Sequence, residues 1–139
     1  RTVKKRYRAI VIPKDADRFH IGDKGTIDLP LASDYMERPC QIVDFENGKR
    51  AITEWRVETI INLQSSEINQ EVSLLLVPHT GRTHQLRVHC ASPLGLNSPI
   101  KGDPLYGQRS DRLHLYAVYL EFTHPATGQR MRFSFSSCL

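Results

Sequence analysis

Residues 78–89 bring together two arginines and three histidines, side chains that can bind anions, hold metals or transfer protons. They are Arg82, Arg87, His79, His84 and His89. The preceding run, 72–77, is mostly apolar and predicts a largely buried strand, and Gly81 then interrupts the chain before a segment with helix-compatible spacing. If Thr83 opens that helix, its hydroxyl can accept a hydrogen bond from a free backbone N–H.

Arg87 is unusual because of the helix face on which it falls. At about 100° per residue, the apolar arc contains Leu86, Cys90 and Ala91, and Arg87 lies inside it. Burying an unpaired guanidinium is costly, so Arg87 is expected either to meet a carboxylate or to emerge into a cleft that binds an anion. The alternative is that its side chain extends past the apolar edge to water.

The histidines also raise the alternative of a zinc site, since they recur every five residues and Cys90 follows the last of them. A spacing of five places helical residues about 140° apart, so His84 and His89 do not converge as an i, i+4 pair would. We therefore expect no metal.

Composition indicates one globular domain. The chain has 139 residues with 40% hydrophobic content, and no apolar run approaches the ~20 residues of a membrane span. The basic N-terminus lacks the apolar stretch of an export signal. Three widely spaced cysteines argue against a disulfide framework and against paired-cysteine zinc sites, so a cytoplasmic location is expected. Without a membrane-spanning run, no membrane partner is expected either.

Charge is segregated along the sequence. The net charge is +6 over residues 1–14, −6 over 15–71 and +4 over 72–139, and the last segment also holds five of the six histidines. Basic segments on either side of an acidic middle suggest a face that binds a polyanion such as RNA. The alternative is an ordinary solvated surface.

Strands dominate the predicted secondary structure. Alternation at period two predicts a first strand over 1–12, and Pro13 ends it. Because this strand starts at residue 1 with no preceding turn, we expect the chain to continue a longer one. Further strands are predicted at 26–29, 51–63, 72–77, 113–123 and 129–135. With one principal helix, the fold class is α+β with a mainly antiparallel mixed sheet, and the strands at 51–63 and 72–77 are expected to form a hairpin.

The first strand has two different faces. Tyr7 lies on one face with Lys5 and Ala9. The other face carries Lys4, Arg6 and Arg8, which can track RNA phosphates or can simply keep an edge strand soluble.

Motifs spread over the whole chain resemble the RluA-type RNA pseudouridine synthases. They are Lys5-Arg6-Tyr7-Arg8-Ala9, Gly48-Lys49-Arg50-Ala51, Gly81-Arg82-Thr83-His84-Gln85-Leu86-Arg87, Gly102-Asp103-Pro104-Leu105-Tyr106-Gly107 and Leu113-His114-Leu115-Tyr116-Ala117. The resemblance implies isomerisation of uridine in ribosomal or transfer RNA, with the base flipped out and no cofactor.

The family's essential aspartate lies in an Arg-Leu-Asp motif, and this sequence contains none, since its one Arg-Leu pair is followed by His114. We therefore expect residues 1–139 to be the C-terminal part of a catalytic domain, inactive alone without its N-terminal part. An exposed sheet edge would then favour oligomers.

The resemblance assigns roles to individual residues. Tyr7 matches the tyrosine that packs against the flipped base, and Arg87 matches the arginine that pairs with the catalytic aspartate, which leaves Arg87 here to face an open cleft, another anion or water. Arg82 and His84 are expected to contact RNA. Asp103 is expected to close a turn rather than to act as a nucleophile. The alternative function is a non-catalytic RNA-binding module.

Overall fold

A computed structural model describes residues 3–15, 17–63 and 70–135 of the chain. Six strands form one sheet, in the order β2 (Lys24–Asp28), β5 (Ile52–Asn62), β6 (Gln70–Pro78), β1 (Lys4–Val11), β7 (Leu115–Thr123) and β8 (Arg130–Ser134). All five neighbouring pairs are antiparallel. The α+β class expected from the sequence is confirmed.

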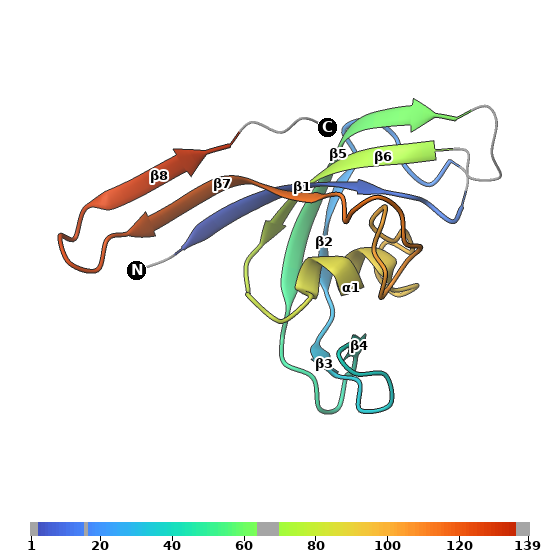
Figure 1. The fold of residues 1–139 in the computed structure, drawn as a ribbon, viewed down its shortest axis with the longest axis horizontal. Helices are drawn as coiled ribbons and strands as arrows, with labels where there is room; N and C mark the ends of the chain where they lie inside the picture. The colour runs from blue at the N-terminus through green and yellow to red at the C-terminus, as the bar shows by residue number, and fades with distance from the viewer. Residues whose placement is uncertain (1–2, 16, 64–69, 136–139) are drawn as a thin grey trace.

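The remaining elements lie on one side of this sheet (Figure 1). Helix α1 (Gln85–Ala91) packs beneath the sheet, and the separate hairpin β3 (Leu31–Ser33) and β4 (Gln41–Val43) lies below the helix. The β7–β8 pair extends away from the helix on the left of the view. Residues of α1, the central strands and the small hairpin can therefore contribute to one candidate site.

The core lies between the sheet and α1, as the period-two pattern predicts. In β6, Val72, Leu74 and Leu76 are fully buried, while the residues between them are only partly so. They pack with Leu86 and Cys90 of α1. Burying a leucine side chain stabilises the fold by about 1.5–3 kcal/mol, so this contact is the main force that holds the helix on the sheet.

One prediction about the elements needs correction. The sequence predicts a loop from Pro13 to about Pro39 apart from the strand at 26–29, but this segment also contains β3, which pairs with β4 in the register Leu31↔Val43 to Ser33↔Gln41. Strands of three residues are too short to show a period-two pattern. The predicted hairpin of β5 and β6 is present, with residues 64–69 between them outside the described residues.

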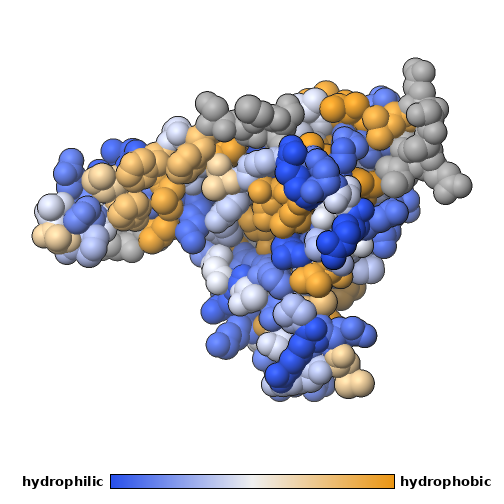
Figure 2. Space-filling view, viewed as in Figure 1, coloured by the Kyte–Doolittle hydropathy of each residue, from blue (hydrophilic) through white to orange (hydrophobic). Residues whose placement is uncertain are grey.

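β1 is a central strand, so the interpretation of its basic residues as protection of an edge is wrong. The outer strands are β2 and β8. On the β7–β8 arm, Phe122 and Phe133 stack with ring centroids 6.1 Å apart, and the space-filling view shows hydrophobic residues gathered along this arm (Figure 2). Within the described ranges, no helix has the length and apolar character needed to cross a membrane.

Candidate active site

A cavity of about 240 Å³ opens at the entry to α1. β1 contributes Lys5 and Tyr7, the turn contributes Gly81, Arg82 and His84, and the helix contributes Arg87, among other lining residues. Four residues singled out from the sequence therefore share one cavity: Tyr7, Arg82, His84 and Arg87. Sequence reasoning did not select Lys5, although it placed Lys5 on the same face as Tyr7.

Arg87 meets a carboxylate, as its position on the apolar face of the helix required. Its Nε donates to Asp103 Oδ2 at 3.0 Å and its Nη2 to Asp103 Oδ1 at 2.7 Å. The Arg87 side chain is 16% exposed and that of Asp103 is fully buried. The Arg87 guanidinium also lies 5.3 Å from the centroid of the Tyr106 ring. The alternative in which Arg87 extends to water is wrong: Arg87 binds another anion, Asp103, and also lines the cavity.

Asp103 also closes its own loop. Its Oδ1 accepts hydrogen bonds from the backbone N–H groups of Leu105 at 3.0 Å and Tyr106 at 3.2 Å, which confirms the predicted turn role. Burial alone would raise the pKa of Asp103, but hydrogen bonds from Arg87 and from these two amides lower it below its usual value. The hydrogen bonds that Arg87 donates to the Asp103 carboxylate in turn raise the pKa of Arg87. The pair is therefore ionised and fixed.

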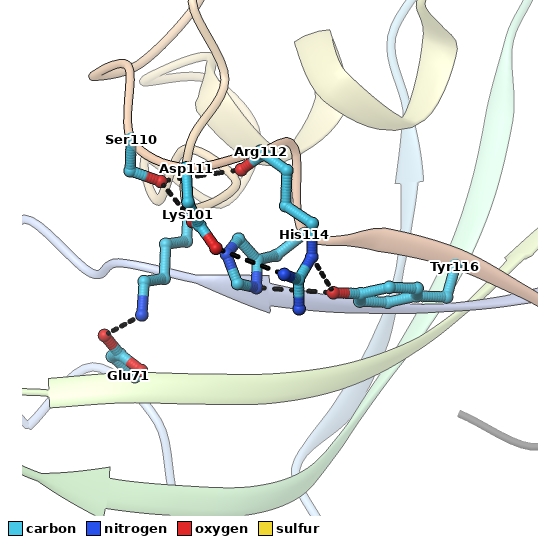
Figure 3. Close-up of polar contacts among 7 residues, drawn as sticks. All are labelled: Glu71, Lys101, Ser110, Asp111, Arg112, His114 and Tyr116. Atoms are coloured by element: carbon cyan, nitrogen blue, oxygen red, sulfur yellow. Dashed lines mark hydrogen bonds and ion pairs between the residues drawn. The ribbon is translucent and has the colours of Figure 1, made fainter. Parts of the chain in front are cut away.

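The loop that carries Asp103 is held in place by contacts on both sides. Gly102 has φ of +81°, and a Cβ there would lie 1.7 Å from the Arg112 carbonyl oxygen, so only glycine fits. Beyond it, a polar cluster ties the loop to the sheet (Figure 3). His114 Nε2 hydrogen-bonds Asp111 Oδ1 at 3.0 Å, and Lys101 pairs with Glu71 of β6 at 2.8 Å.

Gln85, the first residue of α1, links the turn to β5. Its Nε2 donates to the Ile52 carbonyl at 2.9 Å and to Thr53 Oγ1 at 3.0 Å. Its Oε1 accepts from Thr80 Oγ1 at 2.7 Å and from the Arg82 backbone N–H at 3.1 Å. This one buried side chain fixes the turn that presents Arg82.

His89 is fully buried and serves the structure rather than the cavity. Its Nε2 donates to the Leu29 carbonyl at 2.9 Å, so its Nδ1 accepts the hydroxyl proton of Thr53 at 2.8 Å. Burial lowers the pKa of His89, which keeps the ring neutral. Among the described residues, no group of three or more His, Cys, Asp or Glu side chains is placed to hold a metal ion.

His84 occupies the N-cap position of α1, so the prediction that Thr83 caps the helix is wrong. His84 has φ of 55° and ψ of 20°, and no side-chain cap hydrogen bond is made. A left-handed conformation is uncommon for a residue with a Cβ and costs about 1–3 kcal/mol. Strain of this kind is often found at functional sites.

A hydrogen-bond chain sets the tautomer of His84. The backbone N–H of Gln41 donates to the Tyr106 hydroxyl at 2.7 Å, and that hydroxyl lies 2.8 Å from His84 Nδ1. Within the described residues the phenol proton has no other acceptor, so it is donated to Nδ1 and the ring carries its proton on Nε2. Burial and then the charge of Arg87 lower the pKa of His84. His84 is therefore a neutral donor in the wall of the cavity.

Lys4, Arg6 and Arg8 lie away from this cavity, on the opposite face of β1 from Tyr7. Arg8 Nε pairs with Glu58 at 2.8 Å, and the Arg6 guanidinium lies 4.6 Å from the centroid of the Tyr119 ring. Tyr7 instead lies over the core and pairs in register with Leu76. If all three basic residues bind RNA, they do so on a different face from the residues around the cavity.

Comparisons with known proteins agree on one family. The sequence model for RNA pseudouridylate synthase matches residues 1–92. The dual-specificity RNA pseudouridine synthase RluA of Haemophilus influenzae is 39% identical over 99% of the chain and 58% of its own length. The RluA protein of Escherichia coli K12 is 41% identical over 79% of the chain and 48% of its own length.

Solved structures give the same result. Human RNA pseudouridylate synthase domain containing 1 superposes with a TM-score of 0.77 and 27% identity, covering 97% of the chain and 55% of the human protein. A second human relative, domain containing 4, shares the fold with a TM-score of 0.61 and 23% identity. The chain thus spans about half the length of the relatives it matches.

Proposed function

The chain belongs to the RNA pseudouridylate synthase family, and from this premise we propose that it forms the uridine-binding part of an RNA pseudouridine synthase. The reaction breaks the bond between C1′ and N1 of a uridine and joins C1′ to C5, and the proton on C5 moves to N1. Atoms balance without an oxidant, a reductant or a cofactor. A flipped base enters a small pocket in such enzymes, and the cavity beside Tyr7 and Arg87 offers one.

The observation that carries this proposal is the position of the Arg87 guanidinium. Asp103 uses Nε and Nη2, while Nη1 makes no hydrogen bond in the described part of the chain. A planar guanidinium can hold two carboxylates on different edges. Arg87 lines the cavity, so its remaining edge can orient a second carboxylate beside the bound uridine.

We assign that second carboxylate to an aspartate of an Arg-Leu-Asp motif outside residues 1–139, because the motif is missing from the sequence. The ion pair with Arg87 would keep the aspartate ionised for its attack on the ribose or the base. Tyr7 would pack against the uracil ring and can take part in removing the C5 proton. The neutral His84 would donate from Nε2 to an oxygen of the RNA, and Arg82 would bind phosphate.

The test compares the 139-residue chain with an N-terminally extended form that contains an Arg-Leu-Asp motif. Each is incubated with total RNA, and pseudouridine is mapped. The extended form should convert uridine and the chain alone should not, and conversion by the chain alone would contradict the requirement for the external aspartate.

In the extended form, Arg87→Ala should abolish turnover, with a much smaller effect on RNA binding. The matched control is Arg56→Ala, since Arg56 is exposed and does not line the cavity. Near-normal turnover of Arg87→Ala would refute the role of Arg87.

A second candidate function is a non-catalytic RNA-binding module, favoured by the absence of the Arg-Leu-Asp motif from these residues. RNA binding with no pseudouridine formed by any extended form would support it.

As finer proposals, the substrate is ribosomal or transfer RNA, which the RluA-type resemblance implies, and the protein acts in the cytoplasm, consistent with the free thiols of Cys40 and Cys90. The outer strands β2 and β8 could pair between copies.

A further inference from the structure

A second groove lies next to the cavity, between the β3–β4 hairpin and the turn that leads into α1. Its volume is about 410 Å³. We propose that this hairpin groove binds a nucleotide of the RNA strand adjacent to the target uridine, with its phosphate on Lys49 and Arg82 and its base on the Tyr35 ring. The proposal rests on the proposed function, since it assumes that the target uridine occupies the cavity.

The two sites are continuous. Gly81 and Arg82 line both the cavity and the hairpin groove, so a strand with one base in the cavity leaves it past this turn. Arg82 Nε donates to the Arg50 carbonyl at 2.8 Å, which positions the guanidinium between the two sites. A phosphate that links two neighbouring nucleotides would therefore pass Arg82.

The lining of the hairpin groove suits a nucleotide. It combines the cations of Lys49 and Arg82 with hydrogen-bonding side chains such as Ser33 and Asn47, and none of its lining residues is acidic. The Tyr35 side chain is 78% exposed, a large aromatic surface left in water. Bases stack on such rings with little dependence on sequence, while cations follow the backbone.

The carboxylates near the hairpin groove form no ion pair with its cations among the described residues. Asp34 Oδ1 accepts from the backbone N–H of Met36 at 3.0 Å, and Asp44 Oδ1 accepts from that of Glu46 at 2.9 Å. Each carboxylate is thus oriented by its own turn. Lys49 makes no side-chain hydrogen bond or ion pair with any described residue, so its ammonium group can bind a phosphate.

The wall of the hairpin groove is held before any ligand arrives. Leu31 of β3 is buried with Ala51 and Val88 of α1, and Val43 and Tyr106 pack against them. The Tyr106 hydroxyl also accepts the Gln41 N–H at 2.7 Å. The Arg38 guanidinium lies 5.1 Å from the centroid of the Tyr35 ring. A preformed wall lowers the entropic cost of binding.

The experiment measures binding of the 139-residue chain to a fluorescent uridine dodecamer and to an abasic strand of the same length and charge. Circular dichroism shows that each variant is folded. Tyr35→Ala should weaken binding of the dodecamer at least fivefold, as loss of about 1–3 kcal/mol of stacking predicts, and leave the abasic strand unaffected. Lys49→Ala should weaken both strands and reduce the slope of log affinity against log salt by about 0.7.

Matched controls lie outside the hairpin groove. Phe45→Ala removes an aromatic ring that is 69% exposed, and Lys24→Ala removes an exposed lysine of β2. Groove variants that bind like these controls would overturn the proposal, as would equal losses for both strands in Tyr35→Ala, which would indicate a general anion site. An oligoglutamate peptide that competes as well as the dodecamer would overturn it too.

A second measurement separates this proposal from the proposed function. In the extended form, Tyr35→Ala should raise the RNA concentration for half-maximal turnover and leave the maximal rate unchanged. If no extended form makes pseudouridine while the groove variants still weaken RNA binding, the proposed function fails and the hairpin groove remains an RNA-binding site. If the extended form makes pseudouridine and Tyr35→Ala leaves the half-maximal RNA concentration unchanged, the proposed function holds and the hairpin groove is refuted.

Discussion

The inner and outer sides of the turn that enters α1 use the same residue types for different purposes. On the inner side, Gln85 and His89 both hydrogen-bond Thr53, and their other bonds go to the carbonyls of Ile52 and Leu29 and to the turn itself. On the outer side, the Nε2 of His84 and the Nη1 of Arg87 have no partner within the described residues. A histidine or an arginine in a motif is therefore not by itself evidence of a binding site. A donor atom with no partner in the described part of the protein, such as Nη1 of Arg87, is better evidence.

The largest effect is expected from Asp103→Ala, which removes the buried carboxylate that holds Arg87 of the outer side. It leaves the Arg87 guanidinium, 16% exposed, without its partner, and it frees two backbone amides. Removing one member of a buried ion pair costs about 3–5 kcal/mol, which urea unfolding would measure. Asp111→Ala, in the same loop but 59% exposed, is the control and should lose clearly less, because water can replace its contacts with Arg112 and His114. A similar loss in both variants would show that the loop, not the ion pair, sets stability.

Thr53→Val should come next. It keeps the shape of the residue but leaves the Nδ1 of His89 without its donor, and it removes one acceptor of Gln85. An unsatisfied buried polar group costs about 1–3 kcal/mol in free energy of unfolding. Thr59→Val on the same strand is the control, since Thr59 has no side-chain partner among the described residues. Equal stability of the two variants would mean that the inner network is not what fixes the turn.

Arg82→Ala tests the outer side. Within the described residues its side chain makes one hydrogen bond, to the Arg50 carbonyl, so the free energy of unfolding should change by about 0.5 kcal/mol or less. RNA affinity should fall about fivefold, the loss of about one hydrogen bond, when measured by fluorescence anisotropy. Lower stability with unchanged RNA affinity would show that Arg82 serves the structure of the turn, as the inner-side residues do, and not RNA binding.

The last test is the pH dependence of stability. Burial lowers the pKa of His89 in the folded chain, so the unfolded chain binds the proton first as the pH falls below about 6.5. His89 should therefore lower the free energy of unfolding by up to about 1.4 kcal/mol per pH unit below that value. His89→Gln should reduce this slope, whereas His20→Gln, at a side chain 78% exposed, should keep it. Identical slopes would contradict the assignment.

Much of this fold can be predicted from the sequence because the alternation of apolar residues is local. Val72, Leu74 and Leu76 identify β6 without any knowledge of its neighbours. The β3–β4 hairpin cannot be found in this way, since each of its strands has three residues and its stability comes from packing on Val88 and Tyr106. Its importance for a binding groove is visible only in three dimensions.

The site shows the same division. The helix geometry predicts that Arg87 needs an anion, but the sequence does not identify Asp103, sixteen positions away, as its partner. The left-handed conformation of His84 has no sequence signal, because histidine seldom adopts it. Its tautomer depends on Gln41 and Tyr106, which tertiary packing brings together.

The hydroxyl of Tyr106 links the two proposed binding sites through hydrogen bonds. It joins Gln41 at the hairpin groove to His84 at the cavity, so a nucleotide in the groove and a uracil in the cavity would both lie beside partners of one phenol. Any free energy by which one ligand tightens the other must then be equal in both directions. An RNA whose adjacent nucleotide fits the groove would then bind its uridine more tightly in the cavity. A uridine whose adjacent nucleotide does not fit the groove would not gain this affinity.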